Sequence, residues 1–216
     1  MVSRERFAQG MTFDQYVKFI STPENLKREG SFNLPRKDYG EFFRKAYEAT
    51  PLTSVQREAV AWIAAQPDAP KKVLVLSEDW SSDCRRDVPV FARIAEAGGM
   101  DLRIFTRDGE RMSRSAAPDP KDQPNADVVA PFLRKRDGQT FQSIPIAAFF
   151  TNDFRHLYTY TEFPAIYNKD RVRGSLKDLD AFFAFQQTPF FKIYATAAAD
   201  EIIAMLHERL RVGSLA

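Results

Sequence analysis

A strand, a turn and a helix in direct succession constrain the fold of this chain more than any other part of its sequence. The apolar run Val73–Leu76 predicts a buried strand, and the turn Trp80–Cys84 follows it closely. The next residues, Arg85–Ala95, predict a helix, although Pro89 lies inside it and a proline in a helix interior costs roughly 3 kcal/mol. Cys84 is the only cysteine, so no disulfide can form within one molecule.

The rest of the chain from Lys72 onward continues this alternation. The helix that begins near Cys84 is expected over Asp83–Ala97, where Gly98 and Gly99 close it. Strand patterns follow at three places: Leu102–Phe105, Ile144–Phe150 and Arg155–Tyr160. A helix over 176–186 is expected to pack its apolar side chains, which are Leu176, Leu179, Phe182 and Phe183. A last helix, over 197–211, has a broad apolar face.

The chain is expected to form one decorated domain. Residues 1–70 predict a helical extension, with possible capping boxes formed by Thr12 with Gln15 and by Thr53 with Gln56. Residues 71–187 predict the α/β domain, and 188–216 predict the C-terminal helix. Within the domain, residues 108–142 are a long connection, which we expect to be a mobile insertion because Ser113–Asn125 within it is rich in Pro, Ala, Ser and Asp.

Charge and composition exclude several classes of function. The 31 basic and 29 acidic residues nearly cancel, which argues against a dedicated nucleic-acid surface. No apolar run approaches the roughly 18 residues of a membrane span, and the first residues lack the apolar core of a secretory signal. A single cysteine fits a reducing cytoplasm. The two histidines have no ligand partners nearby and no nucleotide motif is present, so we expect neither a metal nor a cofactor.

Several of these features together resemble the thioredoxin family. Glu78–Cys84 is similar to the Glu-Asp-Trp-Cys-x-Asp-Cys motif of a bacterial branch of that family, with Ser81 in place of the first cysteine. A proline five positions after the second cysteine is a family trait, and Gln142–Ile146 resembles the cis-proline loop that faces the motif. The resemblance covers about Lys72 to Gln186. It implies a three-layer α/β/α sandwich around a mixed sheet, and a cis Ile144–Pro145 bond.

The resemblance also indicates which residues form the site. Cys84 and Ser81 are the candidate catalytic residues, and the candidate substrate-binding residues are Trp80, Ser82, Asp83, Ser143, Ile144 and Pro145. In the family the first cysteine attacks a disulfide and the second resolves the product. A serine hydroxyl without a neighbouring base is a poor nucleophile, so Ser81 or Ser82 fits a helix N-cap better. Cys84 is either a packed residue or a working thiol, and the acidic pair before Trp80 is expected to be a solvated loop.

Three functions remain open from the sequence. In the first, which we favour, the protein has lost dithiol exchange and binds a protein or peptide at the cis-proline groove, with Cys84 available to capture a partner as a mixed disulfide. In the second, Cys84 acts alone, as a peroxidase-like thiol or in exchange with glutathione; the spacing of Ser81 and Cys84 resembles the Thr-x-x-Cys of peroxiredoxins. In the third, the chain is a structural or interaction domain without thiol chemistry.

Overall fold

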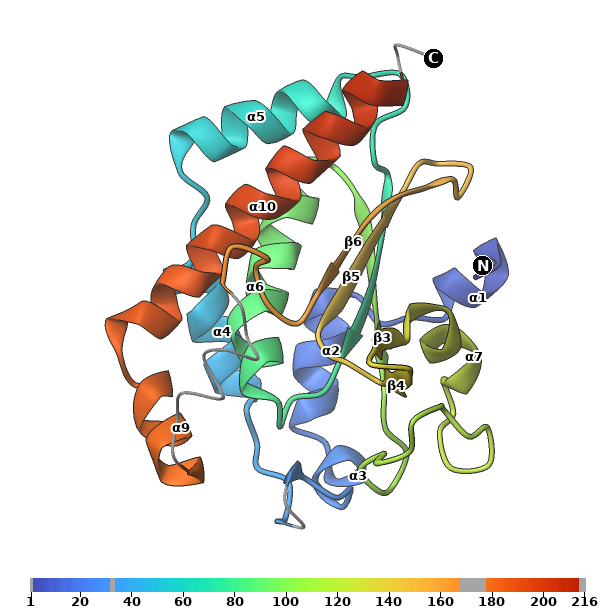
Figure 1. The fold of residues 1–216 in the computed structure, drawn as a ribbon, viewed down its shortest axis with the longest axis vertical. Coiled ribbons are helices and arrows are strands. Elements are labelled where there is room, and N and C mark those ends of the chain that lie inside the picture. Colours follow the sequence, from blue (N-terminus) through green and yellow to red (C-terminus); the bar gives the residue numbers. More distant parts are fainter. Residues whose placement is uncertain (1, 32–33, 168–177, 214–216) are drawn as a thin grey trace.

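A four-stranded mixed sheet forms the centre of the molecule (Figure 1). The computed structural model describes residues 2–31, 34–167 and 178–213. The strands lie in the order β2-β1-β5-β6, with β1 and β2 parallel and the other two pairs antiparallel. Their bounds are Lys72–Ser77 for β1, Asp101–Thr106 for β2, Ile146–Phe150 for β5 and His156–Thr161 for β6. The four strands that the sequence pattern predicts thus lie in one mixed sheet.

The register of this sheet determines where the site lies. Ser77 at the end of β1 is paired with Thr106 at the end of β2, so the residues that follow these strands lie side by side. Leu76 is paired with Ile146, the first residue of β5. β5 begins there, later than the sequence pattern predicts, because Pro145 has no N–H to donate to a neighbouring strand. The turn after β1 and the loop before β5 therefore meet at one end of the sheet.

Helix α6 (Ser82–Ala97) starts at that end and is buried along most of its length. Pro89 lies inside it, as expected. Figure 1 shows α4 (Gly40–Ala49), α5 (Ser54–Ala64) and α10 (Pro189–Gly213) on the same side of the sheet as α6. The short helices α1 (Arg4–Ala8) and α7 (Ala126–Val129) lie on the other side. The sheet thus forms the middle of three layers.

The N-terminal extension packs directly on this domain. Both expected capping boxes are present, at the starts of α2 (Phe13–Ile20) and α5. α2 packs against β2 and α4, and Met11 forms an isolated antiparallel bridge with Ile104 of the edge strand β2. The short helix α3 (Pro23–Leu26) follows, and it leads into the segment that reaches the end of β1.

The connection between β2 and β5 contains structure that the sequence pattern did not predict. It holds α7, the 3₁₀ helix Ala130–Phe132 and a hairpin of β3 (Arg134–Arg136) and β4 (Gln139–Phe141). Each strand of this hairpin has three largely exposed residues, so no apolar alternation marks it.

The two C-terminal helices differ from expectation at their starts. Helix α9 is Leu179–Gln186, and Leu176, which was expected to pack with it, lies outside the described residues. Helix α10 begins at Pro189, well before residue 197, because proline fits the first position of a helix, where no N–H is needed.

The capping box of α5 provides a test of this packing. Thr53 accepts a hydrogen bond from the Gln56 N–H, and the Gln56 side chain binds both the Thr53 N–H and Asp200 of α10. We expect Thr53→Ala to lower the free energy of unfolding by about 1 kcal/mol, measured by urea denaturation, because the helix loses its N-cap acceptor. Thr53→Ser, which keeps the acceptor, should stay near the wild-type value; equal losses in both variants would contradict the capping role.

Candidate functional site

Cys84 is a completely buried free thiol in the first turn of α6. Its Sγ accepts a hydrogen bond from the Glu78 N–H at 3.5 Å, and its own N–H donates to Ser81 Oγ at 3.4 Å. Burial raises the pKa of Cys84 to about 12, although the Glu78 N–H and the hydroxyls of Ser81 and Ser77 oppose the rise. At neutral pH the side chain is therefore a protonated, enclosed thiol, which is the state of a packing residue.

The residues around Cys84 hold the start of the helix rather than face solvent. Ser81, one of the two residues expected to be the N-cap of α6, occupies that position and is largely buried. Ser82 is half-buried. Asp83 is buried and pairs with Arg86 at 3.2 Å. The position that the first cysteine would occupy is thus taken by a hydroxyl that completes the helix terminus.

Trp80 is fixed by the residues that follow β2. Its indole Nε1 donates to Asp108 Oδ2 at 3.0 Å. The guanidinium of Arg107 lies over the indole ring, 5.3 Å from its centroid. Arg107 also donates through Nη1 to the Gln142 carbonyl at 2.9 Å. One arginine thus connects the Trp80 turn to the loop before β5.

The loop before β5 reaches this turn as the resemblance implies. The Ile144–Pro145 peptide bond is cis, and the Pro145 carbonyl accepts a hydrogen bond from the Glu162 N–H at 2.8 Å. Within the part of the chain that the structure describes, Ser143 and Ile144 make no main-chain hydrogen bond. Because Leu76 is paired with Ile146, this unpaired main chain lies at the same end of the sheet as Trp80.

The acidic pair before Trp80 is buried, so the expectation of a solvated loop is wrong. Glu78 and Asp79 are 0% and 2% exposed. Glu78 accepts from Arg28 at 2.8 Å and from Arg36 at 2.6 Å, and Arg36 also binds Asp79. Buried carboxylates persist when they are paired and hydrogen-bonded. Both arginines lie in the N-terminal extension, more than forty residues before the motif, and no local pattern links them to it.

The Glu78 carboxylate also connects the motif to the insertion. It accepts a hydrogen bond from the Asp108 N–H at 2.7 Å. Burial raises the pKa of Glu78 and the nearby Asp108 carboxylate adds to the rise, while Arg28 and Arg36 oppose it. The loop that carries Trp80 is therefore held at its start by buried charge.

A second charge cluster, which the sequence analysis missed, joins α6 to β6. The Arg86 guanidinium binds Asp87 through two contacts of 2.6 Å and donates to the Glu162 carbonyl at 3.0 Å. Tyr160 of β6 donates to Asp87 at 2.8 Å. The three adjacent charged residues Arg85–Asp87, directly before the apolar stretch that begins at Val88, were the available signal.

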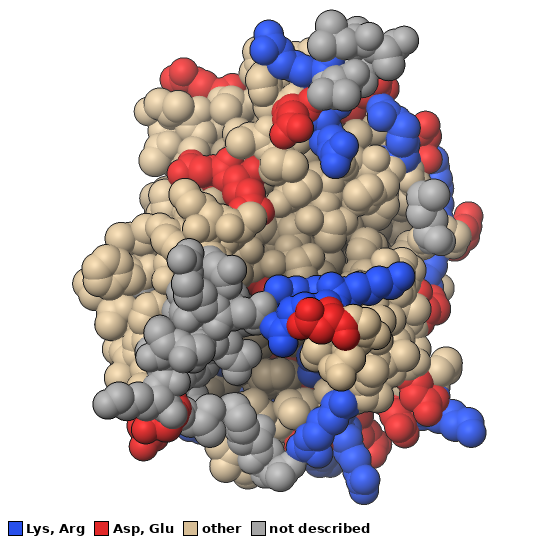
Figure 2. Space-filling view, in the orientation of Figure 1, with Lys and Arg blue, Asp and Glu red and all other residues tan. Residues whose placement is uncertain are grey.

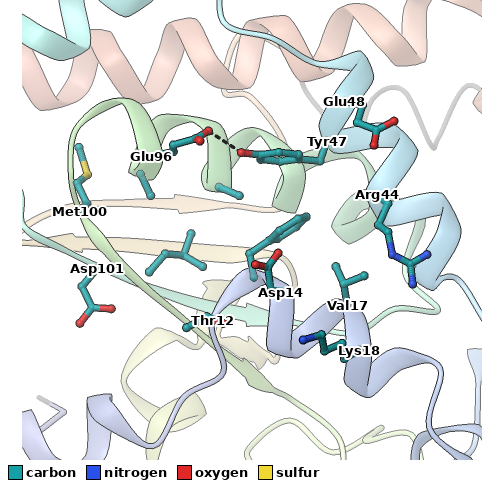
Figure 3. Close-up of a pocket in the computed structure, with 14 residues that line it drawn as sticks. Thr12, Asp14, Val17, Lys18, Arg44, Tyr47, Glu48, Glu96, Met100 and Asp101 are labelled. Atoms are coloured by element: carbon teal, nitrogen blue, oxygen red, sulfur yellow. Dashed lines mark hydrogen bonds between the residues drawn. The ribbon is translucent and has the colours of Figure 1, made fainter.

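A cavity of about 590 Å³ lies away from these residues, between α2, α4, α6 and β2. Figure 3 shows Tyr47 donating to Glu96 at its edge, at 2.5 Å. None of the candidate site residues lines it.

Among residues 2–31, 34–167 and 178–213, no three His, Cys, Asp or Glu side chains come together as metal ligands would. No helix in those ranges has the length and apolarity that a membrane span needs.

Comparison with known proteins agrees with this architecture. A family model described as thioredoxin matches residues 36–116, which is less than half of the chain and includes the Trp80 turn. A crystal structure of a protein of unknown function from Pseudomonas aeruginosa has 18% identity and a TM-score of 0.54, covering 96% of this chain and 99% of that one. The crystal structure of an HIV epitope-scaffold has 15% identity and a TM-score of 0.55, with the same coverage. The search of curated proteins found no match.

The fold is thioredoxin-like: a central mixed sheet, helices on both faces and an added C-terminal helix. The family match supports a relation to thioredoxins over the part of the chain that carries the motif. The two structural similarities extend over nearly the whole chain, including the N-terminal extension, but at this identity they concern the fold alone.

The state of Cys84 can be tested by alkylation. With a pKa near 12, its thiolate fraction at pH 8 is on the order of a thousand-fold smaller than that of a free cysteine, and the thiol has no exposed surface. We expect iodoacetamide to modify the native protein at least about a hundred-fold more slowly than the chain unfolded in guanidinium, as measured by mass spectrometry. Modification of the native protein at the rate of the unfolded chain would contradict the enclosed thiol.

Proposed function

We propose that this protein binds an extended segment of a protein partner at the loop before β5 and does not catalyse dithiol–disulfide exchange. The observation that carries the proposal is the unpaired main chain of Ser143 and Ile144 beside the Trp80 turn. Unpaired strand-like main chain is the element to which extended peptides add by hydrogen bonding. Both residues are largely buried. Buried main-chain N–H and C=O groups without a partner destabilise the folded protein, and hydrogen bonds to a bound peptide would remove that cost.

The chemistry of Cys84 supports binding over catalysis. Exchange needs an exposed thiolate to attack and a second thiol to resolve the mixed disulfide. This chain has one cysteine, and its thiol is enclosed with a raised pKa. The same burial weighs against a peroxidase-like thiol, against exchange with glutathione and against capture of a partner through Cys84.

Peptide addition can be tested by nuclear magnetic resonance. A short blocked peptide of alternating threonine and valine, with glutamates at its centre, serves as the probe. We expect it to shift the amide resonances of Ser143 and Ile144 more than those of residues on α5, because its main chain pairs with theirs. Cys84→Ala should bind with an unchanged Kd, and Ser143→Pro, which removes the donor, should bind about ten-fold more weakly. Shifts confined to other surfaces, or loss of binding in Cys84→Ala, would overturn the proposal.

The missing chemistry can be tested by insulin reduction. We expect the wild-type protein with dithiothreitol to reduce insulin no faster than dithiothreitol alone, because Cys84 has no partner thiol. Ser81→Cys should produce measurable turnover, since the new thiol takes the N-cap position of α6, where the helix dipole stabilises a thiolate. Ser82→Cys, one residue further along the helix, is the matched control and should remain inactive. Turnover by the wild-type protein would show that the thiol is used catalytically.

A further inference from the structure

A pocket of about 900 Å³ opens beside the loop before β5 and has Ser143 in its wall. Its other walls are the β3–β4 hairpin and the first part of the insertion, so most of it is built by residues outside a minimal thioredoxin-like core. In Figure 2, Lys and Arg side chains gather on this face of the molecule around the hairpin. The pocket is continuous with the proposed peptide site because both include Ser143.

The charges that line this pocket are predominantly positive. Among the described lining residues, one is acidic, Glu162, and four are arginines: Arg107, Arg114, Arg134 and Arg136. Arg134 pairs with Glu162 at 2.9 Å, and Arg114 pairs with Glu29 at 2.6 Å. Arg136 pairs with Asp137 at 3.5 Å. The planar fork of donors on each guanidinium matches the geometry of a carboxylate.

Arg107 is the arginine that the fold holds most firmly toward the pocket. Its side chain is 9% exposed, and its Nε and Nη1 are used by Asp108 and the Gln142 carbonyl. Its Nη2 has no hydrogen-bond partner among the described residues. An anion in the pocket can accept a strong, charge-assisted hydrogen bond from this nitrogen.

We propose that the segment bound at Ser143 carries an acidic side chain, and that Arg107 binds its carboxylate with Arg134 and Arg136 around it. The inference rests on the proposed function, which supplies a peptide main chain at Ser143. An extended peptide sends alternate side chains to opposite faces, so a residue paired near Ser143 can direct its side chain into this pocket. The ligand class is therefore an acidic peptide segment, and the arginines of the insertion select its negative charge.

Three matched peptides test the charge preference. They share one threonine and valine sequence and carry glutamates, glutamines or lysines at the same positions; their Kd values are measured by fluorescence anisotropy with the full chain. We expect the glutamate peptide to bind about ten-fold more tightly than the glutamine peptide, and the lysine peptide to bind most weakly. The advantage of the glutamate peptide should shrink as salt is raised from low to high concentration.

Two variants of opposite sign separate charge selection from a structural role. Arg136→Gln should reduce the advantage of glutamate over glutamine about three-fold, and Glu162→Gln should increase it by a similar factor, because it removes the acidic residue of the lining. Arg44→Gln, an exposed arginine on α4 that pairs with Glu41, is the control and should leave the preference unchanged. Unfolding of the Glu162→Gln variant could not strengthen its preference for the glutamate peptide, so such a gain would exclude a merely structural effect.

The outcomes distinguish the preference for acidic peptides from the proposed peptide binding at Ser143. Equal affinity for all three peptides would overturn the acidic selection and leave peptide addition at Ser143 intact. Binding of none of them would overturn both. A preference that Arg136→Gln and Glu162→Gln shift in the same direction would also overturn the inference, because the two changes alter the pocket charge in opposite senses.

Discussion

At the end of β1 the buried carboxylate of Glu78 accepts hydrogen bonds from Arg28 and Arg36 of the N-terminal extension and from the main chain after β2. This one group joins three parts of the chain at the point where the site begins. Removing one partner of such a buried pair costs about 3–5 kcal/mol, because the remaining charge stays in a medium that cannot solvate it. The extension is therefore part of the site's framework, and the Trp80 turn depends on it for its position.

The consequence of this framework is a turn that is held in place over an enclosed thiol. Trp80 is fixed by Asp108 and covered by Arg107, and Cys84 lies beneath with its proton retained. Among the described residues, the main chain of Ser143 and Ile144 makes no main-chain hydrogen bond. We propose that this thioredoxin-like fold binds an extended chain at that main chain, where arginines of the insertion line the neighbouring pocket.

The elements with a clear hydrophobic periodicity or a capping motif could be predicted from the sequence, whereas the short and polar elements could not. The apolar run of β1 and the capping boxes of α2 and α5 are local signals, and the structure contains each of them. Each strand of the β3–β4 hairpin has only three residues, and five of the six are polar, so the strands show no hydrophobic alternation. The burial of Glu78 was mispredicted for another reason: a charge is normally exposed, and its arginine partners lie far away in the sequence.

The sequence by itself determined that this protein cannot form an internal disulfide, because a single cysteine is a covalent fact, and that a strand, a capped helix and an internal proline surround it. Only the tertiary structure decided the protonation of Cys84, the pairing of Glu78, the unpaired main chain at Ser143 and the basic pocket beside it. Each of these depends on burial and on contacts between segments distant in the sequence. A local sequence pattern does not indicate which distant side chains will contact these buried groups in place of water.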